Sequence, residues 1–318
     1  MTSHLPLGPG AEFDAVRALL AAWGQRARGI GDDGAMLDVP PGDRLVVSTD
    51  ATVEDVHFRR GWLTAEEIGW RAAMAALSDL AAMGAAPLGL LLAVSVPAAW
   101  RDDLGAIAHG VGEAAARVDI PIVGGDVTAG DRLALTITVL GSAARPVTRG
   151  GAQPGDRVFV TGRLGGPGDA LAAWERGEAP RPASRARFAR PEARLAAGRW
   201  LAARGATAMI DLSDGLAGDA AHVAAASGVR LVLDADRVPC ADGCAAEAAL
   251  RSGEEYELLV TAPALDAAAL ARACERLTLT EIGRVEASDI PGPGVVIIRG
   301  GVRGAAPGAH DHFGREIP

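Results

Sequence analysis

The sequence predicts an α+β protein made of two halves of comparable size. Segments with helical spacing and short Val- and Leu-rich strands occur in both halves, without the strict β-α-β alternation of a doubly wound parallel sheet. The stretch 145–156 is rich in Pro, Gly and charged residues, as domain linkers are. We therefore expect an N-terminal mixed sheet-and-helix domain over residues 1–145 and a C-terminal α+β domain over residues 146–318.

The N-terminal half contains three segments with helical periodicity and three with the character of strands. The expected helices are 14–23, 65–83 and 101–118. The expected strands are 44–49, 88–96 and 133–140. Gly24 and Gly84 provide the stops of the first two helices. Asp79 lies inside the apolar helix 65–83, where a carboxylate without a partner would be costly.

The C-terminal half shows the same mixture. Strands are expected at 157–161, 206–210, 257–261 and 295–298. Helices are expected at 169–176, 216–226 and 265–277, the second of them ended by Gly228. The glycine-rich loop 162–168 follows the first strand and precedes a helix, so its amides could bind a phosphate. A flexible turn explains the loop equally well.

Five short aspartate motifs are the main chemical feature of the chain. They are Gly31-Asp32-Asp33, Ser48-Thr49-Asp50, Ser78-Asp79, Gly124-Gly125-Asp126 and Asp211-Leu212-Ser213-Asp214-Gly215. Each follows or interrupts an apolar stretch, so we expect the carboxylates at strand ends or on packed helices. Carboxylates brought together repel one another unless cations intervene, and Mg²⁺ prefers such oxygen ligands. Singly, each motif has an ordinary explanation as a turn or a helix N-cap.

The composition excludes several kinds of nucleotide-using protein. All 31 basic residues are Arg, and the chain contains no Lys and no Asn. A P-loop, a protein-kinase fold and a pyridoxal enzyme each require a Lys, so none of them is present. The net charge of −9 argues against a general nucleic-acid binder. An acidic protein can still bind ATP, because metal ions bring positive charge to the phosphates.

The termini and cysteines carry little functional signal. The N-terminal segment 1–10 has no cationic flank or apolar run, and 85–100 is too short to span a bilayer, so we expect a cytoplasmic enzyme. The spacing of Cys240, Cys244 and Cys274 fits no zinc site. His310-Asp311-His312 could chelate a metal, but a solvated tail explains it equally well.

Read together, these segments resemble the thiamine-monophosphate kinase family of the aminoimidazole-ribonucleotide-synthetase-like (PurM-like) superfamily. The aspartate motifs carry the resemblance in the family's order over nearly the whole chain. The further matching segments are Val53-Glu54-Asp55-Val56-His57-Phe58, Ile68-Gly69-Trp70, Leu77 to Ala85, Gly151 to Asp156, Gly253 to Leu258 and Asp311-His312-Phe313. The resemblance implies the two-domain PurM-like fold, with ATP and Mg²⁺ binding and dimerisation assigned to the N-terminal domain.

The resemblance also implies roles for individual residues. Several Mg²⁺ ions would be held by Asp33, Ser48, Thr49, Asp50, Asp79, Asp126, Asp211 and Asp214. ATP would be contacted by Gly125, Asp126, Arg149 and Ser213. Thiamine monophosphate would be contacted by His57 and Glu254, and His310 stands where the family has an aromatic residue that stacks on the thiamine ring. A homodimer whose N-terminal halves share a barrel-like sheet is implied as well.

Three further positions depart from the family's pattern. Ser252 replaces a Gly and Glu255 replaces an Asp in the family's Gly-Gly-Glu-Asp-Tyr-Glu segment, and Val127 replaces a Thr after Gly-Gly-Asp. These changes, with His310, bear on thiamine recognition more than on the metal and ATP chemistry.

The resemblance implies direct transfer of the γ-phosphoryl group of ATP to thiamine monophosphate. A phosphate oxygen is the nucleophile and is already anionic near pH 7, so no catalytic base is expected. A superfamily relative with another acceptor, or a catalytically silent regulator that binds ATP or metal, are the alternatives. We expect small-molecule substrates as partners, and neither nucleic acid nor a membrane.

Overall fold

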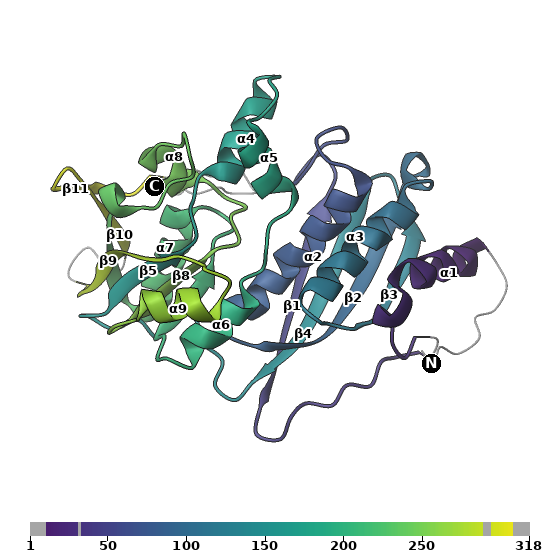
Figure 1. Ribbon diagram of the computed structural model, residues 1–318, viewed down its shortest axis with the longest axis horizontal. Helices are drawn as coiled ribbons and strands as arrows, with labels where there is room; N and C mark the ends of the chain where they lie inside the picture. The colour runs from purple at the N-terminus through teal and green to yellow at the C-terminus, as the bar shows by residue number, and fades with distance from the viewer. Residues whose placement is uncertain (1–10, 31–32, 289–293, 308–318) are drawn as a thin grey trace. The chain divides into compact units, whose positions relative to one another are not determined.

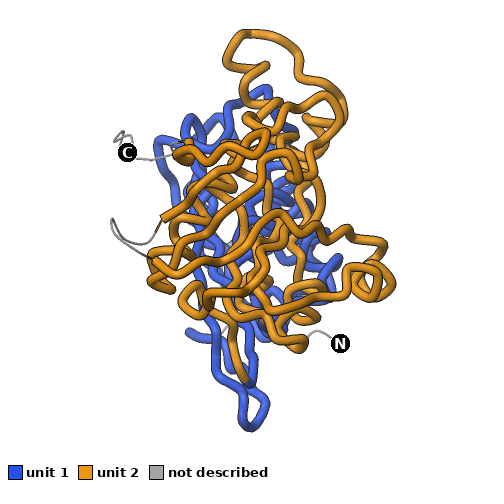
Figure 2. Tube along the Cα trace, turned by 90° about the vertical axis from the view of Figure 1, so that its left-hand side faces the viewer, with its two compact units in different colours: residues 1–80, 85–144 blue, residues 81–84, 145–318 orange. Residues whose placement is uncertain are grey.

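The computed structural model describes residues 11–30, 33–288 and 294–307. The chain forms two compact units, which Figure 2 shows in different colours. Unit 1 comprises Met1–Leu80 and Ala85–Ala144, and unit 2 comprises Ala81–Gly84 and Arg145–Pro318. None of the described helices is long and apolar enough to cross a membrane.

Unit 1 is built on a four-stranded sheet in the order β1-β4-β2-β3. Its strands are β1 (Arg44–Val53), β2 (Ala86–Val96), β3 (Ile122–Ala129) and β4 (Ala134–Ala143). Its helices are α1 (Ala11–Trp23), α2 (Ala65–Ala82), whose last two residues belong to unit 2, and α3 (Leu104–Arg117), with short 3-10 turns at Gly24–Arg26 and Ala98–Trp100. Only the β2–β3 pair is parallel, and the other pairs are antiparallel.

Helices α2 and α3 cover one face of this sheet (Figure 1). Alternate residues of β4 face them, and Leu135, Ile137 and Val139 are fully buried there. Among the described residues, the opposite face is open along β1. On it, Leu45 is 50% exposed and Val47 is 55% exposed.

Unit 2 is built on a seven-stranded mixed sheet in the order β11-β10-β7-β9-β5-β8-β6. Its strands are β5 (Arg157–Thr161), β6 (Ala208–Asp211), β7 (Val229–Asp234), β8 (Leu258–Ala262), β9 (Leu279–Ala287), β10 (Gly294–Arg299) and β11 (Val302–Ala305). Its helices are α4 (Gly166–Glu175), α5 (Pro182–Ala189), α6 (Leu195–Ala202), α7 (Leu216–Ser227), α8 (Ala246–Arg251) and α9 (Ala267–Ala273), with a 3-10 turn at Ala235–Arg237.

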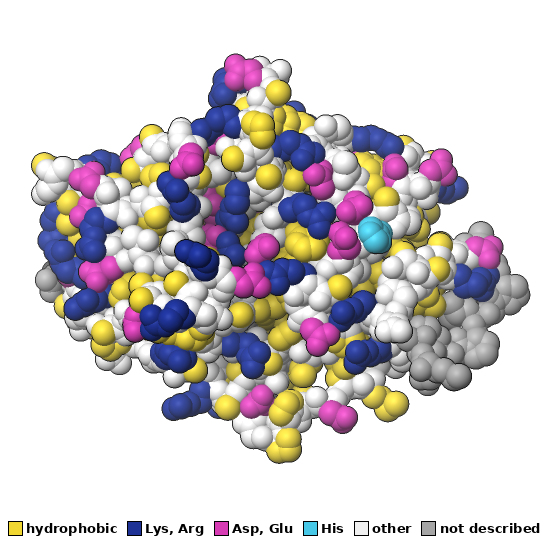
Figure 3. Space-filling model, viewed as in Figure 1, with side chains coloured by type: hydrophobic (Ala, Val, Ile, Leu, Met, Phe, Trp, Pro, Cys, Tyr) yellow, Lys and Arg dark blue, Asp and Glu magenta, His cyan; other side chains and the backbone are white. Residues whose placement is uncertain are grey.

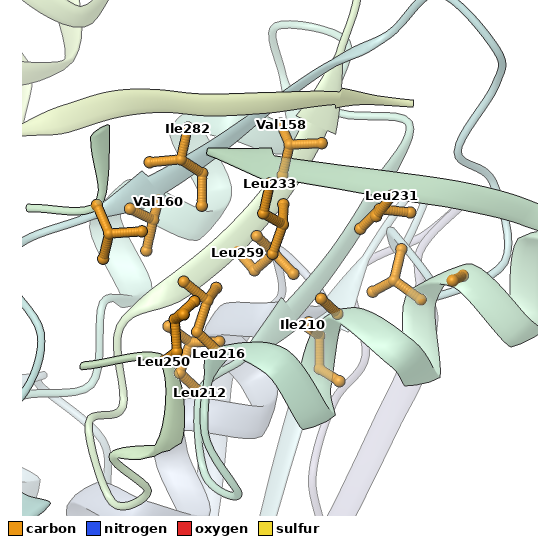
Figure 4. Close-up of a cluster of buried hydrophobic side chains, with 14 of the residues drawn as sticks. Val158, Val160, Ile210, Leu212, Leu216, Leu231, Leu233, Leu250, Leu259 and Ile282 are labelled. Atoms are coloured by element: carbon orange, nitrogen blue, oxygen red, sulfur yellow. The ribbon is translucent and has the colours of Figure 1, made fainter. Parts of the chain in front are cut away.

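The apolar core of unit 2 places α7 against the sheet. Val158, Leu233 and Leu259 of the strands join Leu216 of α7 in one buried cluster (Figure 4). Gly228 ends α7 in the left-handed conformation, as the sequence predicts. This packing fixes the first turn of α7, and with it the Asp211–Gly215 segment that leads into the helix.

Two expectations about the elements were wrong in a way that bears on function. Asp50 and Asp126 lie inside β1 and β3, not at strand ends. The helix expected at 265–277 is limited to α9, which ends at Ala273. Gly and Asp are poor strand formers, which hid β3, but its pairing with β2 overrides that preference. The strands β7, β9 and β11 and the helices α5, α6 and α8 were also not predicted.

Candidate functional site

In unit 1, the structure brings three of the predicted metal residues to one side of the sheet. The Ser48 hydroxyl donates to Oδ2 of Asp79 over 2.5 Å, which ties β1 to α2. Ser48 and Asp50 are two residues apart on β1, so both side chains lie on the face that the helices cover. Asp79 therefore has the partner that its place in an apolar helix required.

Asp126 lies on the other face of the same sheet. It is paired with Ala93, which is paired with Thr136, and Thr136 is paired with Ala51. Directly paired residues share a face, and this row alternates with the buried row of Leu92. The structure therefore does not bring Asp126 together with Asp50 and Asp79. Thr49 lies on the Asp126 face too, where its hydroxyl is 3.1 Å from that of Thr138.

The remaining predicted residues of unit 1 occupy distinct local settings. Asp33 is exposed in the segment before β1. Gly125 is required by close packing, because a Cβ there would lie 1.9 Å from the Leu92 carbonyl oxygen. His57 is half-buried in the turn after β1, and its Nδ1 accepts a hydrogen bond from the Val53 amide over 3.1 Å. An accepting Nδ1 places the ring proton of the neutral imidazole on Nε2.

In unit 2, three carboxylates gather where β6 passes into α7. Asp211 ends β6, Asp214 follows it, and Asp219 lies in the first turn of α7. Asp219 is 1% exposed, and its Oδ2 accepts from the amides of Ser213 (3.1 Å) and Asp214 (3.2 Å). Burial, reinforced by the negative charges of Asp211 and Asp214, raises the pKa of Asp219 to about 8.

The segment that carries Glu254 is hydrogen-bonded, through its backbone, to the Asp211–Gly215 segment. The Glu254 amide donates to the Ser213 carbonyl over 2.8 Å, and the Tyr256 amide donates to the Leu212 carbonyl over 2.9 Å. Glu254 and Tyr256 have φ values of 63° and 52°, a conformation that costs a non-glycine residue about 1–3 kcal/mol. The Tyr256 hydroxyl also donates to Oε2 of Glu254. Ser213, Asp214 and Glu254 are therefore brought together.

Arg149 lies at the other end of α7. Its carbonyl oxygen accepts from the hydroxyl of Ser227, the last residue of the helix, over 2.9 Å. A helix of this length spans about 18 Å, so the backbone of Arg149 is remote from the first turn. His310 lies outside the residues that the structure describes.

Amides of the glycine-rich loop 162–168 are hydrogen-bonded to other parts of the protein. Its amides at Gly162, Leu164, Gly165 and Gly168 donate to Thr278, Pro239, Glu255 and Ser252 respectively. The loop is therefore a buried structural turn rather than an open row of amides for a phosphate.

The two departures at Ser252 and Glu255 contact each other. The Ser252 hydroxyl donates to Oε1 of Glu255 over 2.6 Å, and the Gly165 amide donates to the same oxygen over 2.5 Å. Glu255 is 1% exposed, and its Oε2 has no hydrogen-bond partner among the described residues. Burial raises the pKa of the Glu255 carboxyl to about 7. Ser252, which stands where the family pattern has a Gly, thus supplies a hydrogen bond to the carboxyl of Glu255.

This raised pKa predicts a pH dependence of stability. The carboxyl binds its proton more tightly in the folded than in the unfolded chain, whose value is 4.5, so its stabilising contribution is complete below about pH 4.5 and is lost as the pH rises to about 7. The contribution is at most about 3 kcal/mol. Glu255→Gln should remove this part of the slope in urea unfolding measured between pH 4.5 and 8. An unchanged slope in the variant would contradict the assignment.

A buried ion network lies beside the site and was not predicted. Arg194 donates to both carboxylate oxygens of Glu257, over 2.9 and 2.6 Å, and Arg187 donates to Oε1 over 3.1 Å. Burial opposes ionisation of Glu257, but the charge and hydrogen bonds of Arg194, with Arg187 and Thr161, hold its pKa below the usual value.

Sequence reasoning also missed Asp219. Its signal was present, because an acidic residue in the first turn of a helix is well placed to accept from the amides ahead of that helix. Within the part of the chain that the structure describes, no three of the predicted aspartates bring one oxygen each within 4.8 Å of one another. Mg²⁺ commonly binds one or two carboxylates together with water and phosphate oxygens, so the observed arrangement fits such ions.

Comparison with known families defines the class of protein. Residues 31–143 match the N-terminal domain of AIR synthase related proteins, and residues 153–295 match the C-terminal domain of the same class. The fold is shared with hydrogenase maturation protein HypE in complex with ATP, at a TM-score of 0.80 over 96% of this chain and 97% of that one. At 20% identity, that likeness concerns the fold alone.

Closer relatives define the family within this class. Thiamine-monophosphate kinase of Salmonella typhimurium is 37% identical over 83% of this chain and 85% of its own length. The crystal structure of the enzyme from Stenotrophomonas maltophilia K279a is 37% identical, covers 90% of this chain and 96% of its own, and has a TM-score of 0.79. AaThiL complexed with AMPPCP and TMP is 30% identical over 95% and 97% of the two chains, with a TM-score of 0.75. The chain belongs to the thiamine-monophosphate kinase family.

Proposed function

We propose that this protein transfers the γ-phosphoryl group of ATP to the phosphate of thiamine monophosphate, giving thiamine diphosphate and ADP. The observation that carries the proposal is the bonding of the Asp211–Gly215 segment to the strained Glu254–Tyr256 segment in unit 2. The proposed ATP and metal motif and the proposed thiamine-substrate motif are therefore adjacent although they lie in sequence-distant segments, which supports the proposal. Family membership supplies the reaction.

Several Mg²⁺ ions are proposed to neutralise and orient the phosphates of the two substrates when they are bound. The donors fit this ion, because every proposed ligand offers a carboxylate or hydroxyl oxygen and Mg²⁺ prefers oxygen. In unit 2 the ligands would be Asp211 and Asp214, and a cation there would offset the negative charges that add to the effect of burial on the pKa of Asp219. In unit 1 they would be Ser48, Asp50 and Asp79, with Asp33, Thr49 and Asp126 at separate positions.

The other proposed roles are to bind and orient the substrates. Glu254 is held by its own backbone bond to Ser213 and by the Tyr256 hydroxyl, so it can contact thiamine monophosphate from a fixed position. His57 is oriented by the Val53 amide. Ser213, Gly125 and Arg149 are proposed ATP contacts, and Arg149 would reach the nucleotide at a point remote from the first turn of α7. The acceptor phosphate is already ionised near pH 7, so no residue need remove a proton.

The proposal is tested by incubating the protein with ATP, Mg²⁺ and thiamine monophosphate and measuring thiamine diphosphate by chromatography, with free thiamine assayed in parallel. Product from the monophosphate alone is expected. ATP binding without any thiamine product would overturn the proposal and favour a relative with another acceptor or a silent regulator.

We also infer that the protein is a homodimer formed through the open face of the unit 1 sheet. Leu45 and Val47 are half-exposed on that face, and a second copy would bury them in a sheet-on-sheet contact. Leu45→Arg should convert the dimer to a monomer in sedimentation analysis. Met36→Arg, at a residue that is 98% exposed outside the sheet, is the matched control and should stay dimeric. A monomeric parent protein would contradict the inference.

A further inference from the structure

A second group of metal-binding side chains lies on unit 1, on the helices that cover the sheet. Glu66 of α2 and His109 and Glu113 of α3 each offer one ligand atom, and these atoms all lie within 4.8 Å of one another. Acidic side chains gather beside a histidine over α2 and α3 in Figure 3. None of the three residues belongs to the motifs assigned to ATP, Mg²⁺ or thiamine monophosphate.

The helix backbones set the positions of these side chains. A Cβ on Gly110 would lie 2.0 Å from the carbonyl oxygen of Glu66, so this glycine lets α3 touch α2 at Glu66 itself. A Cβ on Gly69, about one turn further along α2, would likewise lie 2.0 Å from the carbonyl oxygen of Ile107, so the two helices are also in close contact there. His109 directly precedes Gly110. The close contact between the two helix backbones therefore fixes the position of His109 near Glu66.

The spacing along α3 completes a chelate. His109 and Glu113 are four residues apart and therefore lie on the same side of the helix. Nε2 of His109 is 3.8 Å from Oε1 of Glu113, longer than a hydrogen bond. Two ligand atoms bound at about 2.1 Å to one tetrahedral ion lie roughly 3.4 Å apart, so this pair needs little movement. Glu66 and Glu113 are half-buried and His109 is exposed, which leaves the group open to an ion from solvent.

Glu67, the residue after Glu66, caps the start of α2. Glu67 accepts from the Thr64 amide over 2.9 Å, and its own amide donates to the Thr64 hydroxyl over 3.2 Å. This reciprocal pair is a capping box that begins α2. The first turn of α2 thus uses Glu67 to cap the helix and directs Glu66 towards α3.

We propose that Glu66, His109 and Glu113 bind a divalent transition-metal ion, with Zn²⁺ as the expected occupant. One imidazole nitrogen with two carboxylates suits Zn²⁺ and its neighbours, whereas Mg²⁺ and Ca²⁺ favour sites made of oxygen alone. The ion would join the start of α2 to the middle of α3, with water completing its coordination. Because α2 also carries Asp79, the bound ion would stiffen the helix that supports the Ser48–Asp79 contact.

The test is a Zn²⁺ titration of the full chain by calorimetry in the presence of excess Mg²⁺, which occupies the oxygen-only positions. His109→Ala should weaken one Zn²⁺ site by at least about tenfold, since even the loss of an outer partner of a metal ligand costs that much. His222→Ala removes an exposed histidine of unit 2 and is the matched control, with no expected change. Equal Zn²⁺ affinity in the parent and His109→Ala proteins would refute the site.

A second measurement uses the unaltered protein and so does not depend on how the variant folds. Diethylpyrocarbonate modifies accessible imidazoles, and peptide mass spectrometry reports each histidine separately. Zn²⁺ should protect His109 and leave His222 equally reactive. Equal modification of His109 with and without Zn²⁺ would overturn the proposal.

Discussion

Asp211→Asn is expected to lower kcat by roughly 10²- to 10³-fold, the loss typical when one preorganised charge-stabilising contact is removed. The substitution keeps the size of a side chain that is 5% exposed at the end of β6, so unit 2 should still fold. It also removes one of the two charges that raise the pKa of Asp219. The Mg²⁺-free variant should therefore be at least as stable as the parent protein, although it is nearly inactive.

This combination separates a metal ligand from a structural carboxylate. Thermal unfolding with and without Mg²⁺ should show a smaller Mg²⁺-dependent rise of Tm in Asp211→Asn than in the parent, because ligand binding stabilises the folded state by mass action. Asp242→Asn, at an exposed aspartate of the same unit, is the control and should change neither kcat nor the Mg²⁺ response. Full turnover by Asp211→Asn would remove this residue from the proposed site.

Glu257→Gln should produce a large loss of stability in unit 2. It removes the buried carboxylate that Arg194 and Arg187 share, and breaking such a pair costs about 3–5 kcal/mol. Arg194 keeps the half-exposed Glu192 as a partner, and Arg187 keeps Glu255 at 3.6 Å. For a unit of this size each kcal/mol lowers Tm by about 2–4 °C, so a fall of roughly 6–20 °C is expected. Differential scanning calorimetry measures it directly.

Two further variants show whether the cause is the uncompensated charge. Glu281→Gln removes a carboxylate whose partners Arg157 and Arg237 are half-exposed, and should change stability by at most about 0.5 kcal/mol. Adding Arg194→Met to Glu257→Gln should recover part of the lost stability, because it removes a guanidinium that has lost its buried counter-charge. If the double variant is less stable than Glu257→Gln, then packing rather than charge accounts for the loss.

The sequence alone was sufficient to predict the class of protein and the helices with a strong apolar periodicity. The apolar spacing of α2 and α7, with the glycines that end them, predicted both helices because local preferences and tertiary packing agree there. The order of the aspartate motifs predicted the family, which the comparisons confirm. The predicted helix 265–277 was too long, because an Ala-rich segment has a high helix propensity whether or not the fold continues the helix.

Only the tertiary structure decided which of the predicted residues meet. Asp50 and Asp126 look equivalent in the sequence, yet strand register places them on opposite faces, because side chains alternate at every residue along a strand. The partners of Asp79 and Glu257 come from segments far away in the chain. The same holds for the two helices that bring Glu66 to His109. Periodicity reports only how the residues of one segment are spaced along the chain. Contacts between distant segments form only when each unit folds.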